Sequence, residues 1–554
     1  MEKIIILDFG SQTSQLIGRR IRDMGVYTEI YPGDISLTSE ILEDVKGIVL
    51  SGSPYSVYSS EGPVPDQSIY TCGLPLFGIC YGLQRITKDN GGVVEALPER
   101  EFGNLEILLV WPAANAQLLG DETLVPGFFS GFNASLTLKD IIDGNIPDDI
   151  NRKHQPAVTL QSWMSHGDTI TKLAPGFKQY GTSIKGAPAV LVHETKPWMG
   201  VQFHPEVTHC ERGNEIIAGF VFGVCKCSPG WTMEQYIEEV RDDLKNRVGT
   251  NPVLLLISGG VDSTVAGALL LKTLNPDQVH LMYMDTGLMR KNETATVKVT
   301  LEKLGAKHLH IIHCEDEFLG ALKGVEEPEA KRKAIGDLFI QIQEREVARL
   351  GLPADCFLAQ GTLYTDLIES GKGVGKKAHV IKSHHNVRSP LVEEKRRAGK
   401  IIEPLDRLYK DEVRALGRIL GIDEEVVRRH PFPGPGLAVR ILGEVTKDRC
   451  DILREADAIY INELKRRGLY DDIWQAFAIL LPIRSVGVAG DVRKYGWVLA
   501  LRAISSTDGM TADVYPFHMK DLLEMSTLIT NQVSDIGRVT YDISSKPPAT
   551  IEWE

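Results

Sequence analysis

The sequence predicts an α/β protein with two doubly wound domains, followed by a third region that is organised differently. Short apolar runs with strand character, such as 3–7 and 253–257, precede stretches with helical spacing, such as 11–24 and 264–271. Strands that alternate with helices in this way form a parallel sheet with helices on both faces. The chain has 554 residues, 43% of them hydrophobic and 24% charged, which suits three or four globular domains.

Charge and composition narrow the classes of partner. The formal net charge is −13, which argues against a nucleic-acid partner held by bulk electrostatics. The apolar runs are too short to span a bilayer, and the chain begins with a strand-like run rather than a signal peptide. Eight cysteines are spread over the chain. We therefore expect a cytoplasmic protein that binds neither nucleic acid nor membranes.

A cysteine lies at a predicted strand-to-helix turn in the first third of the chain. Cys80 follows the strand-like run 74–79, with Gly78 and Gly82 on either side. A sharp turn of this kind needs small neighbours so that the thiol protrudes, and the helix start offers backbone N–H groups, such as that of Tyr81, to an oxyanion. The pattern predicts a nucleophile elbow, although a buried structural cysteine beside a turn fits these residues equally well.

A histidine with a nearby carboxylate supplies the partner that such a thiol needs. His204 ends the strand-like run 199–203, and Glu206 follows two residues later. On extended backbone, residues two apart share a face, so Glu206 can orient the His204 ring to accept a proton from Cys80. Cys80, His204 and Glu206 are therefore the candidate catalytic residues.

The segments GICYGLQ at 78–84 and GVQFHPE at 200–206 together resemble the class I glutamine amidotransferases, over roughly residues 1–227. The resemblance implies a glutaminase in which Cys80 attacks the side-chain amide of glutamine, releases ammonia and leaves a thioester that water hydrolyses. It also places Gly52 in the oxyanion hole with Tyr81. Ser53 stands where the family usually has a glycine, and it still provides an N–H group.

A glycine-rich loop follows the apolar run 253–257. Its two glycines allow the backbone to approach phosphate oxygens closely, and free N–H groups at the following helix start favour negative charge. No lysine follows the glycines, unlike in a Walker A loop, so transfer of the terminal phosphate is not the expected chemistry. A glycine-rich turn without a ligand is the structural alternative. The candidate ATP-binding residues are Ser258, Gly259, Gly260, Val261, Asp262 and Ser263, with Asp285 and Gly287 at the end of the next strand-like run.

The SGGVDS loop resembles that of the N-type ATP pyrophosphatases, which implies that ATP is split between its α and β phosphates and leaves AMP on a substrate oxygen. Mg²⁺ is expected with the ATP, and it prefers oxygen ligands. Asp366 and Glu369 are three residues apart, as on one helix face, and Asp262 and Asp366 are the candidate metal ligands. The glycine- and lysine-rich stretch 371–377 predicts a lid, and the further candidates for the lid and for adenylation are Lys382, His384, His385, Lys410 and Asp411.

Several longer strings resemble the GMP synthetases, in one order along the chain. They are WMSHGD at 163–168, the stretch 321–336, RHPFPGPGLAVR at 429–440 and the terminal stretch 538–554. The resemblance implies a glutamine amidotransferase domain at 1–227, an ATP pyrophosphatase domain at 228–434 and an α+β dimerisation domain at 435–554. The residues that it implies for XMP binding are Arg332, His430, Lys546, Thr550, Ile551 and Glu552.

This resemblance implies glutamine-dependent amination of XMP to GMP. ATP first adenylates XMP and releases pyrophosphate, after which ammonia displaces AMP. Glutamine, ATP and XMP would be the substrates, Mg²⁺ the cofactor, and the protein a homodimer through its C-terminal domain. Two alternatives share parts of the pattern, namely another ammonia-dependent adenylating synthetase, such as an NAD synthetase, and a nucleotide-binding homologue without catalytic activity.

Overall fold

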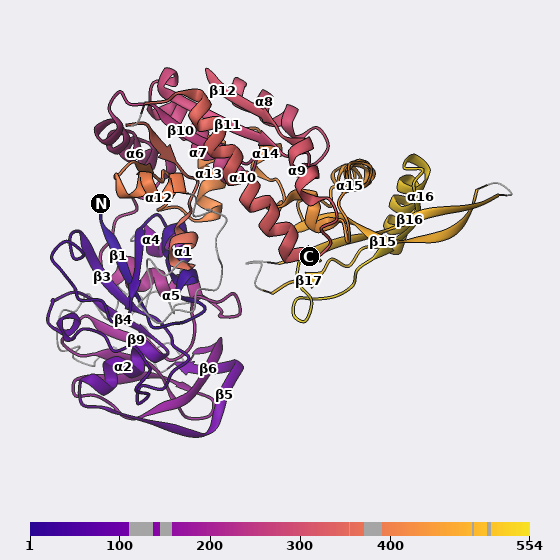
Figure 1. Ribbon diagram of the computed structural model, residues 1–554. Coiled ribbons are helices and arrows are strands. Elements are labelled where there is room, and N and C mark those ends of the chain that lie inside the picture. Colours follow the sequence, from indigo (N-terminus) through magenta and orange to yellow (C-terminus); the bar gives the residue numbers. More distant parts are fainter. Residues whose placement is uncertain (110–136, 144–157, 354, 370–389, 490–491, 507–510) are drawn as a thin grey trace. The chain divides into compact units, whose positions relative to one another are not determined.

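The computed structural model describes residues 1–109, 137–143, 158–353, 355–369, 390–489, 492–506 and 511–554 (Figure 1). The chain forms two compact units, of which the first comprises Met1–Tyr236 with Thr365–Ser383 and the second Ile237–Tyr364 with His384–Glu554. The α/β class is confirmed, whereas the domain limits at 227 and 434 stay a prediction. Among the described residues, every helix is too short or too polar to cross a membrane.

One nine-stranded sheet forms the centre of the first unit. Five neighbouring strands at one side run parallel, and the other four join in antiparallel pairs. The order across the sheet is β2 (Tyr27–Pro32), β1 (Lys3–Asp8), β3 (Val45–Leu50), β4 (Leu76–Ile79), β9 (Trp198–Val201), β8 (Pro188–His193), β7 (Phe177–Ser183), β5 (Val93–Leu109) and β6 (Val158–Lys172).

Both faces of the parallel part of this sheet are covered. Residues 4–7 of β1 are fully buried, and adjacent residues of a strand point to opposite faces. On one face, the ring of Phe77 stacks on that of Phe220, with 5.1 Å between the ring centroids. The helical elements described in this unit are α1 (Ser14–Asp23), η1 (Gln67–Tyr70), α2 (Tyr81–Asp89), α4 (Leu138–Ile142), α5 (Gly213–Ala218) and η3 (Gly219–Val224).

The second unit begins with a five-stranded parallel sheet (Figure 1). Its strands follow the order β12 (His308–His313), β11 (Val279–Asp285), β10 (Val253–Ile257), β13 (Phe357–Ala359) and β14 (Ile401–Ile402). The helical elements around it are α6 (Met233–Val248), α7 (Val261–Thr273), η4 (Pro276–Gln278), α8 (Glu293–Lys303), α9 (Glu315–Leu322), α10 (Pro328–Leu350), α12 (Pro390–Arg397), α13 (Lys410–Ile419) and α14 (Glu424–Val427). Helix α11 (Tyr364–Glu369) belongs to the first unit from Thr365 onward.

A second, mostly antiparallel sheet follows within the same unit. The long strands β15 (Gln475–Ala489) and β16 (Val492–Ser505) form a hairpin, and β17 (Asp513–Val514) and β18 (Ile536–Tyr541) pair with β16. This α+β arrangement also includes η5 (Gly436–Arg440), α15 (Lys447–Arg466) and α16 (Met519–Gln532). One hydrophobic core connects the two sheets, since buried side chains such as Leu254, Leu437, Leu480 and Met525 belong to a single cluster.

The backbone is tightly crowded where β3, β4 and α2 meet. A Cβ atom built on Gly82 would lie 2.2 Å from the carbonyl oxygen of Leu50, and one built on Gly78 would lie 2.6 Å from the amide nitrogen of Leu83. Both neighbouring atoms belong to the backbone, so no side-chain rotation can make room for the Cβ atom. Glycine is therefore required at both positions on steric grounds alone.

We expect Gly82→Ala to lower the melting temperature by about 3–10 °C, because the added methyl group must push β3 and α2 apart. Differential scanning calorimetry measures this change. Gly320→Ala is the matched control, because a Cβ atom there meets nothing within 4 Å and the site lies inside α9. A Gly82→Ala protein as stable as the wild type would show that the crowding is not a structural requirement.

Candidate active sites

Cys80 has the backbone conformation of a nucleophile elbow. It is the N-cap residue of α2, with φ of 51° and ψ of −106°, in a region that side-chain-bearing residues seldom adopt. The conformation is held by a hydrogen bond from the Cys80 amide to the carbonyl of Val201, at 2.8 Å. Tyr81 provides the first N–H of the helix, which has no acceptor within the helix itself. The local geometry predicted from the glycine spacing is therefore present.

The thiol, imidazole and carboxylate predicted from the sequence lie together. His204 contacts the Cys80 thiol through a side-chain hydrogen bond, and its Nδ1 lies 2.7 Å from Oε1 of Glu206. The Thr13 hydroxyl donates to the same carboxylate oxygen at 2.6 Å. Because Glu206 is fully buried and Cys80 and His204 nearly so, this array is shielded from water.

The side chains of this array shift one another's pKa values. Burial lowers the pKa of His204, but the Glu206 carboxylate and the Cys80 thiol more than compensate, so that this pKa lies well above its usual range. Burial likewise raises the pKa of Glu206, and the His204 ring outweighs that effect and brings it below its usual value. An imidazolium between a carboxylate and a thiolate is the arrangement that activates a cysteine nucleophile.

The predicted oxyanion-hole residues come from neighbouring strands. β3 pairs in parallel with β4, so the loop after Leu50 and the turn at Cys80 share one edge of the sheet. A Cβ atom on Gly52 would lie 3.1 Å from Cε1 of His204, so a side chain there would press against the imidazole ring. Ser53 is not among the positive-φ residues, so it fits this loop without backbone strain. The roles of Gly52 and Tyr81 stay predictions.

Two polar contacts of this site escaped the sequence analysis. Gln202 donates a hydrogen bond from Nε2 to Sγ of Cys80 at 3.6 Å, and Thr13 supports Glu206 from the start of α1. Gln202 precedes His204 by two residues, so the periodicity that linked His204 to Glu206 could also have revealed it. Thr13 carries no such signal, because 193 residues separate it from Glu206.

The SGGVDS loop is organised by its own side chains. Oγ of Ser263 accepts a hydrogen bond from the Ser258 amide at 3.2 Å, and the two hydroxyls lie 3.0 Å apart. Gly259 has φ of 80°, and a Cβ atom there would lie 3.1 Å from Val297. The loop therefore holds its shape before any phosphate arrives, with the N-terminus of α7 directed toward the same edge of the sheet.

Charged side chains already neutralise one another at this loop. Nζ of Lys410 lies 2.5 and 2.6 Å from the two carboxylate oxygens of Asp262. Arg429 donates to the Gly259 carbonyl at 3.1 Å and pairs with the buried Glu293 at 2.6 Å. This brings together Asp262 and Lys410, which are 148 residues apart in the chain.

Asp285 and Gly287 lie at the end of the neighbouring strand β11. Oδ1 of Asp285 accepts from the Gly287 amide at 3.1 Å, and Oδ2 accepts from the Thr294 hydroxyl at 2.8 Å. β10 and β11 are adjacent and parallel, so these residues share the carboxyl edge with the SGGVDS loop. Such an edge is where ligands bind in α/β sheets.

Three cationic side chains hold the C-terminal tail. Arg440 binds both carboxylate oxygens of Glu552, at 3.1 and 2.8 Å. Arg502 donates to the carbonyls of Thr550 and Ile551, both at 2.8 Å, and Lys331 pairs with the Glu554 side chain. The side chains of all three cations are fully buried. The exposed Arg332 reaches the same tail through the Glu554 carbonyl.

Other predicted binding residues have different surroundings. Nδ1 of His430 accepts from the Ala476 amide at 3.1 Å and Nε2 lies 2.9 Å from the Tyr470 carbonyl, so both ring nitrogens are engaged by backbone. Burial lowers the pKa of His430 to about 4, which fits this neutral, structural arrangement. The backbone of Lys546 forms an isolated antiparallel bridge with that of Ala512, the residue before β17.

Three family models match successive parts of the chain. They are Glutamine amidotransferase class-I at residues 5–224, NAD synthase at 232–331 and GMP synthase C terminal domain at 462–553. Curated relatives match it over its entire length. The glutamine-hydrolyzing GMP synthase of Chlorobium luteolum is 46% identical over 561 residues, covering 100% of both chains. The chain belongs to the family of glutamine-hydrolysing GMP synthases.

Relatives from distant organisms carry the same name. The glutamine-hydrolyzing GMP synthase of Zymomonas mobilis is 46% identical over 556 residues, covering 100% of this chain and 98% of its own. That of Saccharomyces cerevisiae is 44% identical over 559 residues, with the same coverage. The resemblance found in the sequence is thus confirmed at the level of this GMP synthase family.

Some site residues predicted from the sequence keep only a predicted role. Lys382, His384 and His385 lie outside the described residues, as does the side chain of Glu369. Asp366 lies on α11 and Asp411 in the first turn of α13, one residue after Lys410. Their assignment to the lid, to adenylation or to the metal stays a prediction.

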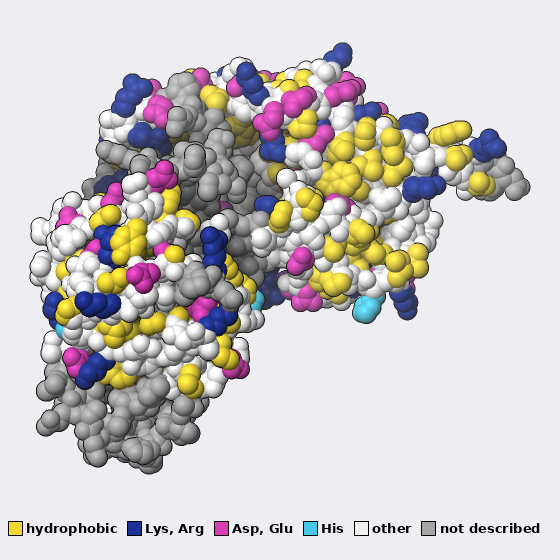
Figure 2. Space-filling model, turned by 90° about the horizontal axis from the view of Figure 1, so that it is seen from below, with side chains coloured by type: hydrophobic (Ala, Val, Ile, Leu, Met, Phe, Trp, Pro, Cys, Tyr) yellow, Lys and Arg dark blue, Asp and Glu magenta, His cyan; other side chains and the backbone are white. Residues whose placement is uncertain are grey.

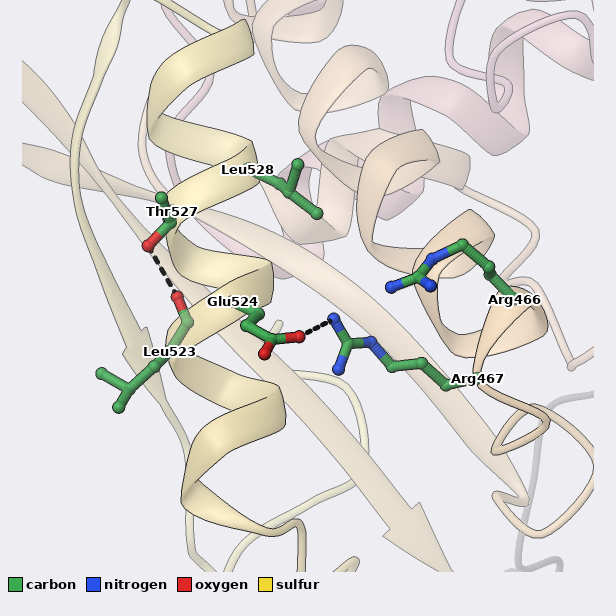
Figure 3. A pocket seen from close by; sticks show the side chains of 6 residues that line it. All are labelled: Arg466, Arg467, Leu523, Glu524, Thr527 and Leu528. Atoms are coloured by element: carbon green, nitrogen blue, oxygen red, sulfur yellow. Dashed lines mark hydrogen bonds and ion pairs between the residues drawn. The ribbon is translucent and has the colours of Figure 1, made fainter.

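A cavity of about 390 Å³ lies between the end of α15 and α16, away from the residues predicted for this GMP synthase activity. Figure 3 shows Arg467 directed toward Glu524, with an N–O distance of 2.8 Å. Leu523 and Leu528 supply apolar surface, and Arg466 and Thr527 complete the lining. Arg467 also pairs with Glu463 and Asp521, so its charge is balanced without a ligand.

A second cavity of about 420 Å³ has the His430 and Tyr470 rings in its wall. These two rings stack with 3.8 Å between their centroids. Arg418 and Arg428 share Glu424, and Arg428 also pairs with Asp471, so most of the cationic lining is neutralised.

The turn that precedes Lys410 contains a carboxyl group with an unusual titration. Burial and the nearby Glu403 carboxylate raise the pKa of Asp406 to about 6, against the influence of Arg407 and Arg247. The folded protein binds this proton more tightly than the unfolded chain does. The free energy of unfolding therefore decreases as the pH rises from about 4 to about 6, and the loss is complete above that range.

We expect Asp406→Asn to raise the melting temperature at pH 8 by about 2–5 °C and to have little effect near pH 4, because it removes a charge that costs stability only when ionised. Calorimetry across this pH range measures the difference. Asp277→Asn, at an exposed ion pair with Lys307, is the control and should change the melting temperature little at either pH. A uniform effect of Asp406→Asn at all pH values would contradict the assignment.

Proposed function

We propose that this enzyme converts XMP to GMP with ammonia taken from glutamine, at the expense of ATP. The observation that carries the proposal is that one chain holds both a hydrogen-bonded Cys80, His204 and Glu206 array and a preorganised SGGVDS loop. The first arrangement is suited to acyl transfer from an amide, and the second to binding a polyphosphate. The full-length match to named GMP synthases supports their combination.

In the proposed glutaminase half-reaction, the Cys80 thiolate attacks the side-chain carbonyl carbon of glutamine. The oxyanion that forms accepts hydrogen bonds from backbone N–H groups at Gly52 and Tyr81. His204 then protonates the leaving nitrogen, and ammonia departs as the thioester forms. His204 next takes a proton from water, which hydrolyses the thioester and releases glutamate. Glu206 holds the imidazole in place throughout.

In the proposed synthetase half-reaction, the C2 oxygen of XMP attacks the α-phosphorus of ATP, and pyrophosphate leaves. Ammonia then adds to C2, the C2–O bond breaks and AMP departs. Backbone N–H groups of Ser258–Ser263 and the Lys410 ammonium group would hold the phosphates, while Asp285 and Gly287 would contact the adenosine. Lys410, which both carboxylate oxygens of Asp262 now engage, would exchange this partner for a phosphate.

The acidic side chains near the SGGVDS loop fit Mg²⁺. Asp262 offers a partly exposed carboxylate at the start of α7, and oxygen ligands of this kind are what Mg²⁺ prefers. Asp262 would hold the ion, and Asp366 stays a second candidate from the sequence alone. When bound, Mg²⁺ would neutralise charge on the triphosphate.

The ordered C-terminal tail supports a nucleotide pocket in the second unit. Arg332, Lys546, Thr550, Ile551 and Glu552 would contact XMP, and the buried cations Arg440 and Arg502 hold the tail in one path. His430, whose ring nitrogens are both engaged, would shape this pocket rather than bind the ligand.

An NAD synthetase shares the ATP-dependent part of this chemistry, in keeping with the NAD synthase model at residues 232–331. The C-terminal match and the full-length relatives favour XMP as the acceptor. The third reading, a homologue without catalytic activity, conflicts with the intact Cys80, His204 and Glu206 array. We further propose a cytoplasmic location, because all eight cysteines are free thiols.

We also propose that the protein forms a homodimer through its C-terminal sheet. The outer half of the β15–β16 hairpin exposes Val486, Val488 and Tyr495, which are 50%, 77% and 61% exposed. Figure 2 shows hydrophobic side chains gathered on the surface near this hairpin. Val486 and Tyr495 are cross-strand partners, so these apolar groups form one face rather than isolated contacts. A second copy of the chain would cover that face.

Cys80→Ala should abolish GMP formation from glutamine by more than about 1,000-fold and leave GMP formation from ammonium salts within about threefold of the wild type, because only the first reaction uses the thiol. Steady-state assays with XMP, ATP and Mg²⁺ and either nitrogen source measure both rates. Cys72→Ala, at a less buried cysteine, is the matched control. Loss of both activities in folded Cys80→Ala would contradict the division between the half-reactions. If deamido-NAD were the only acceptor that gave product, the NAD synthetase alternative would be favoured.

Val488→Glu should convert the dimer to a monomer, because it places a charge in the centre of the proposed apolar contact. Size-exclusion chromatography with light scattering measures the mass. Val299→Glu, at a valine of α8 that is 62% exposed, is the control and should leave the mass unchanged. A wild-type mass for the Val488→Glu protein would rule out this face as the dimer contact.

A further inference from the structure

Gln202 contacts the sulfur of the proposed nucleophile. It follows β9, is fully buried, and donates from Nε2 to Sγ of Cys80 at 3.6 Å. This distance is within hydrogen-bonding range for a sulfur acceptor, and a thiolate is a stronger acceptor than a thiol. Cys80 therefore contacts three polar groups, namely the His204 ring, the Gln202 carboxamide and, at 3.9 Å, the carbonyl of Ser165.

The orientation of the Gln202 carboxamide is fixed by Gln84. Nε2 of Gln84 donates to Oε1 of Gln202 at 3.3 Å and to the Asp168 carbonyl at 2.8 Å. If the Gln202 carboxamide were turned over, its oxygen would face the sulfur and its NH₂ group would face the NH₂ group of Gln84. The contact between the two NH₂ groups would be repulsive, as would that between the oxygen and a Cys80 thiolate, so the N–H of Gln202 points to Cys80.

The same chain of hydrogen bonds continues to a buried acid–imidazole pair. The Asp168 carbonyl also lies 2.8 Å from Nδ1 of His166, which must carry a proton because a carbonyl can only accept. Nε2 of His166 then lies 3.0 Å from Oε2 of Glu101. Burial lowers the pKa of His166, and neither of these two atoms has a hydrogen-bond partner among the described residues, so the two side chains form a close buried contact rather than a hydrogen bond.

The Glu101 carboxylate has a second contact. Oε1 of Glu101 accepts from the Ser183 hydroxyl at 2.8 Å, and Glu101 pairs with His166 in the β5–β6 register. Glu101, His166, Gln84 and Gln202 are between 0% and 5% exposed, so water does not compete for their donors and acceptors. The chain is therefore able to hold the Gln202 N–H in place rather than let it rotate.

We propose that Gln202 is a further catalytic residue of the glutaminase, which stabilises the Cys80 thiolate through this N–H and is itself positioned by Gln84, the Asp168 carbonyl and the His166–Glu101 pair. The inference rests on the proposed role of Cys80 as nucleophile. The Gln202 N–H acts at two steps of the reaction. It favours the thiolate before the attack on glutamine, and it stabilises the sulfur again when water adds to the thioester and the C–S bond breaks with the electron pair going to sulfur.

The test is the pH dependence of Cys80 alkylation by iodoacetamide, followed by mass spectrometry on the full-length protein. We expect Gln202→Leu to slow alkylation at neutral pH by about 10- to 100-fold and to move the profile to higher pH, because a hydrogen bond to a charged group is lost. Glutaminase activity should fall by a similar factor, with GMP formation from ammonium salts unchanged. Gln179→Leu, at an exposed glutamine of β7, is the matched control.

Further variants separate this role from packing. Gln202→Met keeps the length of the side chain and replaces Gln202→Leu if that protein does not fold. Glu101→Leu should shift the profile in the same direction by a smaller factor, because it acts only on the positioning chain. Alkylation of Gln202→Leu or Gln202→Met with the wild-type profile would overturn the inference. Glutamine-driven synthesis that survives in Cys80→Ala would instead overturn the proposed function, so the two failures are distinguishable.

Discussion

The close approach of β3, β4 and α2 is the constraint on which the first unit depends. It leaves no space for a side chain at Gly78 or Gly82, and it forces Cys80 into a positive φ. That conformation lifts the thiol out of the sheet edge and turns the first N–H of α2 to the same side. The loop that carries Gly52 and the strand that leads to His204 reach this edge because β3, β4 and β9 are parallel neighbours. Strain at one residue is thus compensated by the packing of three elements around it.

In the second unit, polar side chains hold the C-terminal tail and the SGGVDS loop in fixed shapes. Arg440 and Arg502 are fully buried cations, of which Arg440 binds the Glu552 carboxylate and Arg502 has several acceptors on the tail. Arg440 also lies over the rings of Phe432 and Phe477, at 4.9 and 4.1 Å from their centroids. Removing such a cation would leave carbonyl and carboxylate oxygens buried without partners, which is more costly than the loss of the contacts alone.

The sequence was most informative where chemistry and backbone geometry coincide. The glycines around Cys80, the two-residue step from His204 to Glu206 and the glycines of the SGGVDS loop each predicted a local structure that is present. It was least informative about contacts between distant segments. Thr13 with Glu206, Lys410 with Asp262 and Arg502 with the tail join residues whose spacing carries no pattern. The ring of His430 shows a further limit, since a histidine in a distinctive loop turned out to be engaged by backbone at both nitrogens.

The ion pair between Asp262 and Lys410 has a consequence for how the synthetase site takes up its substrate. A loop whose fixed charges already cancel exerts little long-range attraction on a polyanion. In the proposed reaction, uptake of a triphosphate with its counter-ion would be an exchange of partners, in which Lys410 would pair with a phosphate and Asp262 would hold the ion. Such a site would discriminate by two complementary charges at once, and a bare phosphate or a bare cation would satisfy only half of it.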